Sequence, residues 1–215
     1  MAQSQRKDIL GAGAYATSAD FEQIFTNDMS SLYLLSFVLA GDPHKAETVF
    51  AAGIEASTKG KRVFRDWARS WARRSVVQSA IRIIQPQQNR QDAGHSQAVA
   101  QAIKKLPPAL QAEAAAIVDL EPLERFVFVM SVLERYSDHD CSILLGCTRR
   151  DVTEARAGAL QQIGTRLSFQ RSDAAASAQW TVHGDFRPAI DLTIARYFAT
   201  QAWNWMPSQD AALQP

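Results

Sequence analysis

The chain has 215 residues, of which 47% are hydrophobic and 21% charged, and its formal net charge at neutral pH is +1. This composition is typical of a globular protein with one or two compact units. It argues against a membrane protein, because no apolar run approaches the roughly 18 residues that a membrane span requires. Residues 1–20 also lack the continuous apolar core of a secretory signal, so we expect a cytoplasmic protein.

Charge is segregated along the first part of the chain. Residues 20–56 contain six acids and one base, which gives them a net charge of −5. Residues 59–84 contain eight bases and one acid, which gives them a net charge of +7. A basic segment of this kind can bind a polyanion.

The arginines of the basic segment repeat at helical spacing. Steps of three, four and four residues place four of them on one face: Arg62, Arg65, Arg69 and Arg73. A different face carries Val63, Phe64, Trp67 and Trp71. One helix is therefore expected to bury two indoles while it presents guanidinium groups to phosphates. The alternative is a solvated basic face that pairs with the preceding acidic segment.

A linker is predicted after the basic segment. Residues 85–94 are polar, contain a proline and have few apolar side chains. Residues 96–118 are alanine-rich and are interrupted by Pro107 and Pro108. We therefore assign residues 85–118 to a linker that contains helical segments.

Residues 119–166 have the pattern of a helix-turn-helix. A first helix carries an apolar stripe at Leu123, Phe126, Val127, Met130 and Leu133. Gly146 is expected to close the next, short helix, and Thr148 to open another. That last helix carries a second apolar stripe at Val152, Ala155, Ala159, Leu160 and Ile163. The alternative is a surface helix in an ordinary three-helix bundle.

The polar side of the last helix is the candidate reading face. Arg150, Thr153 and Glu154 point away from its apolar stripe and can reach a DNA groove. Residues 119–166 nevertheless contain eight acids and six bases, a net charge of −2. Such a domain is expected to bind DNA weakly unless a larger partner holds it on the duplex.

Residues 167–215 form a C-terminal extension with a second aromatic-rich pattern. Its apolar residues align at helical spacing: Ile190, Ile194, Tyr197, Phe198, Ala202 and Trp205. Such a stripe must be covered by something. The sequence leaves open whether it docks onto this chain or makes a partner or autoinhibitory contact.

The two blocks, in this order, resemble the small bacterial sigma-70-like factors of the extracytoplasmic-function group. The match to sigma region 2 consists of Phe21–Phe25, Leu32–Asp42, Ala46–Glu47, Trp67 and Trp71–Ala72. The match to sigma region 4 consists of Leu123–Arg125, Val127–Phe128, Tyr136–Ser137, Leu144–Gly146, Thr148, Val152, Arg156 and Ala159–Leu160. Together they cover residues 20–165.

The resemblance implies an all-α fold with two small helical domains. Residues 18–84 would form a region 2-like bundle and residues 119–166 a region 4-like helix-turn-helix. The implied function is a transcription initiation factor that binds core RNA polymerase and directs it to promoter DNA. An anti-sigma factor is a further partner that the resemblance allows.

The resemblance also implies site residues. Contacts to polymerase are expected from Asp42, Glu47, Val49 and Phe50. Contacts to the downstream promoter element are expected from Arg69, Arg73, Arg74 and Gln78. Contacts to the upstream element are expected from Arg149, Arg150, Thr153 and Glu154. For Arg156, a structural role and a phosphate contact both remain open.

Two departures from the family pattern affect these expectations. The family has further acids and then Gln-Glu after the position of Glu47, whereas this chain has the segment 48–53, Thr-Val-Phe-Ala-Ala-Gly. Arg74 and Gln78 also stand where the family commonly has Asn and Asp. Two alternatives follow: a degenerate sigma-like protein-interaction regulator, and a free-standing helix-turn-helix DNA-binding regulator.

We expect neither catalysis nor a metal or organic cofactor. The sequence has no Gly-rich phosphate loop, no nucleophile elbow and no helical His-Glu-x-x-His. Its four histidines are scattered. Its two cysteines, Cys141 and Cys147, lie within the helix-turn-helix pattern without a second pair at metal-ligand spacing.

Overall fold

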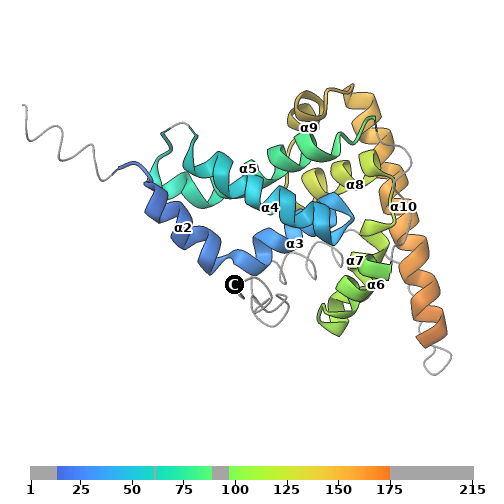
Figure 1. The fold of residues 1–215 in the computed structure, drawn as a ribbon. Helices are drawn as coiled ribbons and strands as arrows, with labels where there is room; N and C mark the ends of the chain where they lie inside the picture. Colours follow the sequence, from blue (N-terminus) through green and yellow to red (C-terminus); the bar gives the residue numbers. More distant parts are fainter. Residues whose placement is uncertain (1–13, 61, 89–96, 175–215) are drawn as a thin grey trace, which may run out of the picture. The chain divides into compact units, whose positions relative to one another are not determined.

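The computed structural model describes residues 14–60, 62–88 and 97–174 (Figure 1). All regular structure in these ranges is helical, so the predicted all-α fold is confirmed. The chain divides into two compact units, residues 1–89 and residues 90–215. None of the helices in the described ranges is both long and apolar enough to cross a membrane. The aromatic stripe predicted beyond residue 190 lies outside the described residues.

Four α-helices and one 3-10 turn form the described part of the first unit: α2 (Ser18–Asn27), α3 (Met29–Ala40), α4 (Pro43–Thr58), η1 (Arg65–Trp67) and α5 (Ala68–Ile84). α3 is the central helix, because nine consecutive residues, 32–40, are buried. A helix that is apolar all round needs neighbours on every side, and α3 packs against α4 and α5. The buried hydroxyl of Ser36 donates to the carbonyl of Leu32 at 2.9 Å, so it is not left unpaired.

Local signals set the ends of these helices. Thr17 begins α2 with a capping box, in which its hydroxyl accepts from the backbone N–H of Asp20 and the Asp20 carboxylate accepts from the backbone N–H of Thr17. Gly41 ends α3 with φ 70°, in the left-handed region that favours glycine. Asp42 then caps α4, whose first residue is Pro43.

α5 begins at residue 68, later than predicted. Its buried face consists mainly of small side chains: Ala68, Ala72, Ser75, Val76, Ser79 and Ala80. This face packs closely against α4, since a Cβ atom added at Gly53 would lie 2.8 Å from Cγ2 of Val76. Trp67 precedes the helix and is 65% exposed, and Trp71 is only partly buried. The prediction that this helix buries two indoles is therefore wrong for Trp67, whereas Trp71 packs against the core cluster of Phe21, Val63 and Ala68.

An extended segment holds the residues before η1. The backbone N–H of Ala16 donates to the carbonyl of Val63 at 2.8 Å, and that of Arg65 donates to the carbonyl of Ala14 at 2.9 Å. Tyr15 and Phe64 thereby form an isolated antiparallel bridge. Residues 62–64 are thus extended rather than helical.

The described part of the second unit contains five α-helices and a short π-helix: α6 (Gln97–Lys104), α7 (Pro108–Val118), α8 (Pro122–Phe128), η2 (Val129–Leu133, the π-helix), α9 (Asp138–Leu145) and α10 (Arg149–Ala174). α7 and α8 both pack against α10. α6, α7 and the turn between them contribute buried side chains, among them Val99, Ile103, Leu106 and Leu110. Residues 97–118 therefore belong to this core, which corrects the predicted linker. Composition did not reveal it, because alanine-rich helices bury little area each and depend on a partner helix.

A buried arginine organises the turn between α7 and α8. Arg125 is 1% exposed, and its Nη1 donates to the carbonyl oxygens of Val118 and Leu120 at 3.0 and 3.2 Å. A buried guanidinium is tolerated only where hydrogen bonds replace water. Arg125 therefore ties the start of α8 to the end of α7.

Candidate nucleic-acid interface

One face of α5 and of the turn before it is open to solvent. It carries Trp67, Ser70, Arg74, Gln78 and Arg82, spaced three or four residues apart. Arg74 is partly buried and the other four are exposed. Arg74 and Gln78 were predicted DNA contacts, whereas Trp67 and Arg82 were not. The face combines an aromatic ring, guanidinium groups and an amide.

Exposed aromatic rings gather beside this face. The Tyr15 and Phe64 rings stack with centroids 4.8 Å apart, and Phe64 meets Trp67 edge to face at 5.6 Å. The guanidinium carbon of Arg62 lies 5.9 Å from the Tyr15 ring centroid. Buried Val63 stands between exposed Arg62 and exposed Phe64. That alternation of burial is typical of extended chain, but the sequence does not display it, because Val63 and Phe64 are both apolar.

The remaining arginines of the predicted stripe contact other helices of the same unit. Arg65 Nη2 lies 3.2 Å from Asp20 Oδ2, and Arg69 Nε lies 2.7 Å from Asp28 Oδ2. Arg73 Nη1 donates to the Ser31 hydroxyl oxygen at 3.0 Å. The stripe therefore faces α2 and the start of α3. This arrangement agrees with the alternative given above, in which the basic face pairs with the preceding acidic segment.

Hydrogen bonds hold the pKa of Asp20 below its ordinary value. The backbone N–H and the hydroxyl of Thr17 both donate to Asp20 Oδ2 at 2.7 Å, and the Arg65 guanidinium adds a smaller effect. These bonds therefore favour the charged form of Asp20. Its charge offsets part of the positive charge of the stripe.

α9 and α10 are successive helices in contact, at the place where the sequence predicted a helix-turn-helix. Gly146 ends α9 with φ 69°, as the sequence predicted. Thr148 and Asp151 form a capping box at the start of α10, with the Thr148 N–H donating to Asp151 Oδ2 at 2.9 Å and the Asp151 N–H donating to Thr148 Oγ1 at 3.1 Å. The Thr148 hydroxyl also donates to Asp151 Oδ2, at 2.8 Å, and this bond together with that from the Thr148 N–H lowers the pKa of Asp151. The start of α10 is thus fixed by local signals.

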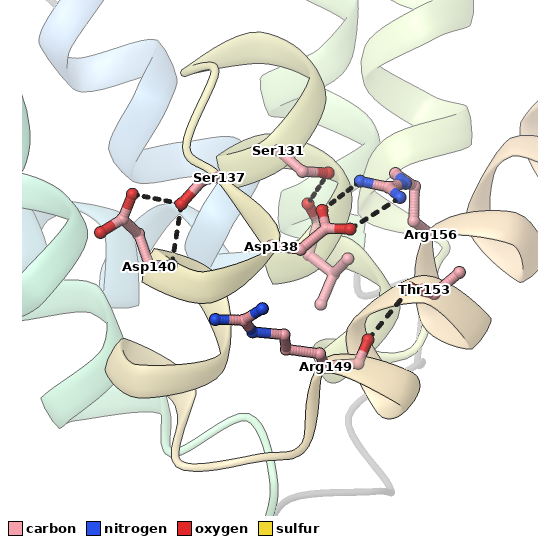
Figure 2. Close-up of polar contacts among 8 residues, drawn as sticks. Ser131, Ser137, Asp138, Asp140, Arg149, Thr153 and Arg156 are labelled. Atoms are coloured by element: carbon pink, nitrogen blue, oxygen red, sulfur yellow. Dashed lines mark hydrogen bonds and ion pairs between the residues drawn. The ribbon is translucent and has the colours of Figure 1, made fainter.

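An ion pair ties the two helices together. Figure 2 shows the guanidinium of Arg156 on α10 pointing at the carboxylate of Asp138 on α9. Two hydrogen bonds join them, one of them from Nη2 to Oδ2 at 3.1 Å. Bidentate pairs of this kind fix orientation as well as distance. Of the two roles left open for Arg156, the structural one fits this geometry.

The four predicted reading residues are all exposed at the start of α10, but they differ in what they contact: Arg149, Arg150, Thr153 and Glu154. Arg150 Nε pairs with Glu154 Oε1 at 2.7 Å. The Thr153 hydroxyl donates to the carbonyl of Arg149 at 3.0 Å (Figure 2). Among the described residues, no ion pair involves the Arg149 side chain. No carboxylate in that part of the chain therefore competes with DNA for its guanidinium, in contrast to Arg150.

The predicted polymerase contacts lie on or under α4. Val49 is 0% exposed and Phe50 packs between Phe25 and Tyr33, so the expectation that Val49 touches another protein is wrong. Asp42 accepts from two backbone N–H groups of the first turn of α4. Glu47 is exposed. Glu47 therefore shares an open face of α4 with residues that sequence reasoning had not selected: His44, Thr48, Ala51 and Glu55.

Reactive groups are dispersed in the described part of the chain. Within residues 14–60, 62–88 and 97–174, no three His, Cys, Asp or Glu side chains come together as a metal site. Cys141 is buried, and burial raises the pKa of its thiol to about 11. His44 and His139 are exposed.

No protein-family model, curated protein or solved structure matches this chain. Function must therefore be inferred from the α5 face and the α9–α10 pair themselves.

Proposed function

We propose that this chain is a sigma-like transcription initiation factor, which binds core RNA polymerase and directs it to specific promoters. The observation that carries the proposal is the exposed Trp67 on the same solvent face as Arg74 and Gln78, in a chain whose α9 and α10 follow one another across a short turn. Trp67 also contacts the exposed Phe64, and contiguous exposed apolar patches commonly mark interaction sites.

The chemistry of the α5 face suits an unpaired strand of DNA. An indole offers a surface on which a base can stack, and stacking requires no particular base. Arg74 can bind a phosphate or stack on a base. Gln78 carries an amide that can pair with adenine. Promoter opening exposes such unpaired bases, so this face would act at the melted element.

The chemistry of α10 suits duplex DNA. Arg149 is exposed at the start of the helix and can reach a phosphate or a guanine. The net charge of −2 over residues 119–166 makes tight binding by this unit alone unfavourable. The exposed face of α4 around Glu47 would meet polymerase, and polymerase would supply the missing affinity. An anti-sigma factor would compete for the same partners.

Reconstituted transcription tests the proposal. Purified protein is mixed with core polymerase and genomic fragments, and initiation is measured for wild type, Trp67→Ala and Arg74→Ala. We expect the Trp67→Ala variant to initiate about ten-fold less than wild type, because it loses base stacking. Ile143→Ala removes another exposed apolar side chain and is the matched control. If the wild-type protein neither co-elutes with core polymerase nor supports initiation on any fragment, the proposal is wrong.

One group of contacts favours a second candidate, a degenerate sigma-like regulator that binds a protein without starting transcription. Arg65, Arg69 and Arg150 each pair with a carboxylate of this chain. These pairs reduce the charge available to DNA. Such a regulator would bind a protein partner through the exposed α4 face and leave initiation unchanged in the same assay.

A further inference from the structure

The arginine stripe of the first unit is aligned with two carboxylates of the same unit. Asp20, near the start of α2, pairs with Arg65, and Asp28, between α2 and α3, pairs with Arg69. The order of the acids along the chain follows the order of the arginines. Each pair joins residues far apart in sequence, so tertiary packing created it.

The side chain of Asp28 pairs with Arg69 and does not cap the helix that it precedes. It occupies the N-cap position of α3, where an aspartate commonly accepts a hydrogen bond from the first turn. Its side chain makes no such cap bond. Oδ2 lies instead 2.7 Å from Arg69 Nε.

The two arginines remain within reach of a ligand. The side chain of Arg65 is 55% exposed and that of Arg69 is 69% exposed, whereas the paired carboxylates are 23% and 25% exposed. Exposed ion pairs are weak, because water and salt screen them. A phosphate could therefore displace either carboxylate, but it would compete with a negative charge that the fold keeps in place.

We propose that Asp20 and Asp28 are intramolecular competitors for nucleic-acid phosphates, which keep the first unit weakly bound to DNA when the protein is alone. This inference rests on the proposed function, because it assumes that the basic segment meets DNA. The inference would explain why DNA binding by this chain depends on polymerase. The two acids suppress binding until polymerase holds the strand against the α5 face.

Binding of the full chain to a fluorescein-labelled DNA single strand of mixed sequence, about 20 nucleotides long, tests the inference by fluorescence anisotropy across a salt series. Asp28→Asn is the main variant, since it removes the charge without removing a cap bond. We expect about three-fold tighter binding at low salt. The slope of log affinity against log salt should steepen by about 0.7, as one further arginine reaches a phosphate.

Three comparisons separate competition from a general change in charge. Glu22→Gln removes an exposed acid of α2 that makes no ion pair among the described residues, and it should leave the salt slope unchanged. Asp28→Glu keeps the charge and should bind like wild type. In an Arg69→Ala background, Asp28→Asn should gain no more affinity than Glu22→Gln does.

The outcomes distinguish the two proposals. If wild type binds the strand and Asp28→Asn behaves like Glu22→Gln, the competition is refuted and the proposed function stands. If no variant binds the strand, with or without core polymerase, both are refuted. A gain in Asp28→Glu as large as in Asp28→Asn would also refute the competition, because the competing charge is still present. Urea midpoints of all variants serve as the folding check.

Discussion

Single buried polar side chains decide the geometry of the second unit. Arg125 fixes one turn through two carbonyl oxygens, and Glu124, its neighbour, accepts from Gln162 Nε2 on α10 at 2.7 Å. Gly158 on α10 leaves room for that carboxylate, since a Cβ there would meet Glu124 Oε1. Both residues face the core from the first turn of α8. Arg125 is buried and donates to two carbonyl oxygens, whereas Glu124 is only partly buried.

Replacing Arg125 should destabilise the second unit strongly. Arg125→Met keeps much of the side-chain volume but leaves the carbonyl oxygens of Val118 and Leu120 without this donor. We expect a loss of about 3 kcal/mol in the free energy of unfolding, measured by urea denaturation. Arg149→Met, at an exposed position, should change it by less than about 0.5 kcal/mol. Equal losses in the two variants would contradict the role given to Arg125.

Glu124 should make stability depend on pH. Burial raises the pKa of its carboxyl from 4.5, an effect that the Gln162 hydrogen bond partly opposes. A carboxyl with a raised folded pKa stabilises the protein below its unfolded value and loses that contribution as pH rises through the folded value. Relative to wild type, Glu124→Gln should therefore gain stability as pH increases from 4.5 to neutrality. Urea midpoints across this range measure it, and a gain that is flat with pH would contradict it.

At the scale of whole helices, local sequence signals predicted the helix ends well. Features that depend on tertiary contacts were not predicted. Gly146 and Thr148 marked the ends of α9 and α10, because a left-handed turn and a side-chain cap are properties of a few adjacent residues. Spacing alone placed the start of α5 too early. A step of three or four residues cannot distinguish a helix from an extended segment that ends in a 3-10 turn.

The same limit applies to the candidate site. Arg74 and Gln78 lie on the solvent face of α5 as expected, since helical period fixes their direction once the helix exists. The partners of Arg65 and Arg69 depended on where α2 packs, which residue spacing does not encode. Trp67 was assigned to the core because an indole is apolar, although the small residues of α5 already filled that place.

The close contact between α4 and α5 predicts an effect of adding one methyl group. Gly53→Ala would force Cβ against the Val76 side chain and backbone, at 2.8 and 3.2 Å. Overpacking should outweigh the gain in helix propensity and leave a net loss of about 1 kcal/mol, measured as a lower thermal midpoint. Gly164→Ala, where nothing lies within 4 Å, is the control and should be neutral or stabilising. A Gly53→Ala variant as stable as this control would show that the helices can separate without cost.

At the scale of the whole chain, the two units each have a core of their own. In the first, Leu35, Phe37 and Leu39 are 0% exposed, and in the second, Phe126 and Phe128 are 0% exposed. A core of that kind in a unit of this length is enough for cooperative folding. The proposed roles of the two units, binding of an unpaired strand by the first and of duplex DNA by the second, would be compatible with such independence.

Independent folding can be measured directly. Residues 1–89, expressed as a separate chain, should be helical and should unfold in one cooperative transition in urea, followed by circular dichroism at 222 nm. The full chain treated in the same way provides the reference. A gradual, featureless loss of helical signal from the fragment would mean that the first unit requires the second.

The backbone pairing of Ala14 and Ala16 with segment 63–65 makes the aromatic surface depend on the beginning of the chain. Two hydrogen bonds and one stacked ring, contributed by Tyr15, hold Phe64 and the turn that carries Trp67. Truncation just past this point would leave every helix intact and still deprive the indole of its support. A truncation that removes residues 14–16 is therefore expected to alter the aromatic surface.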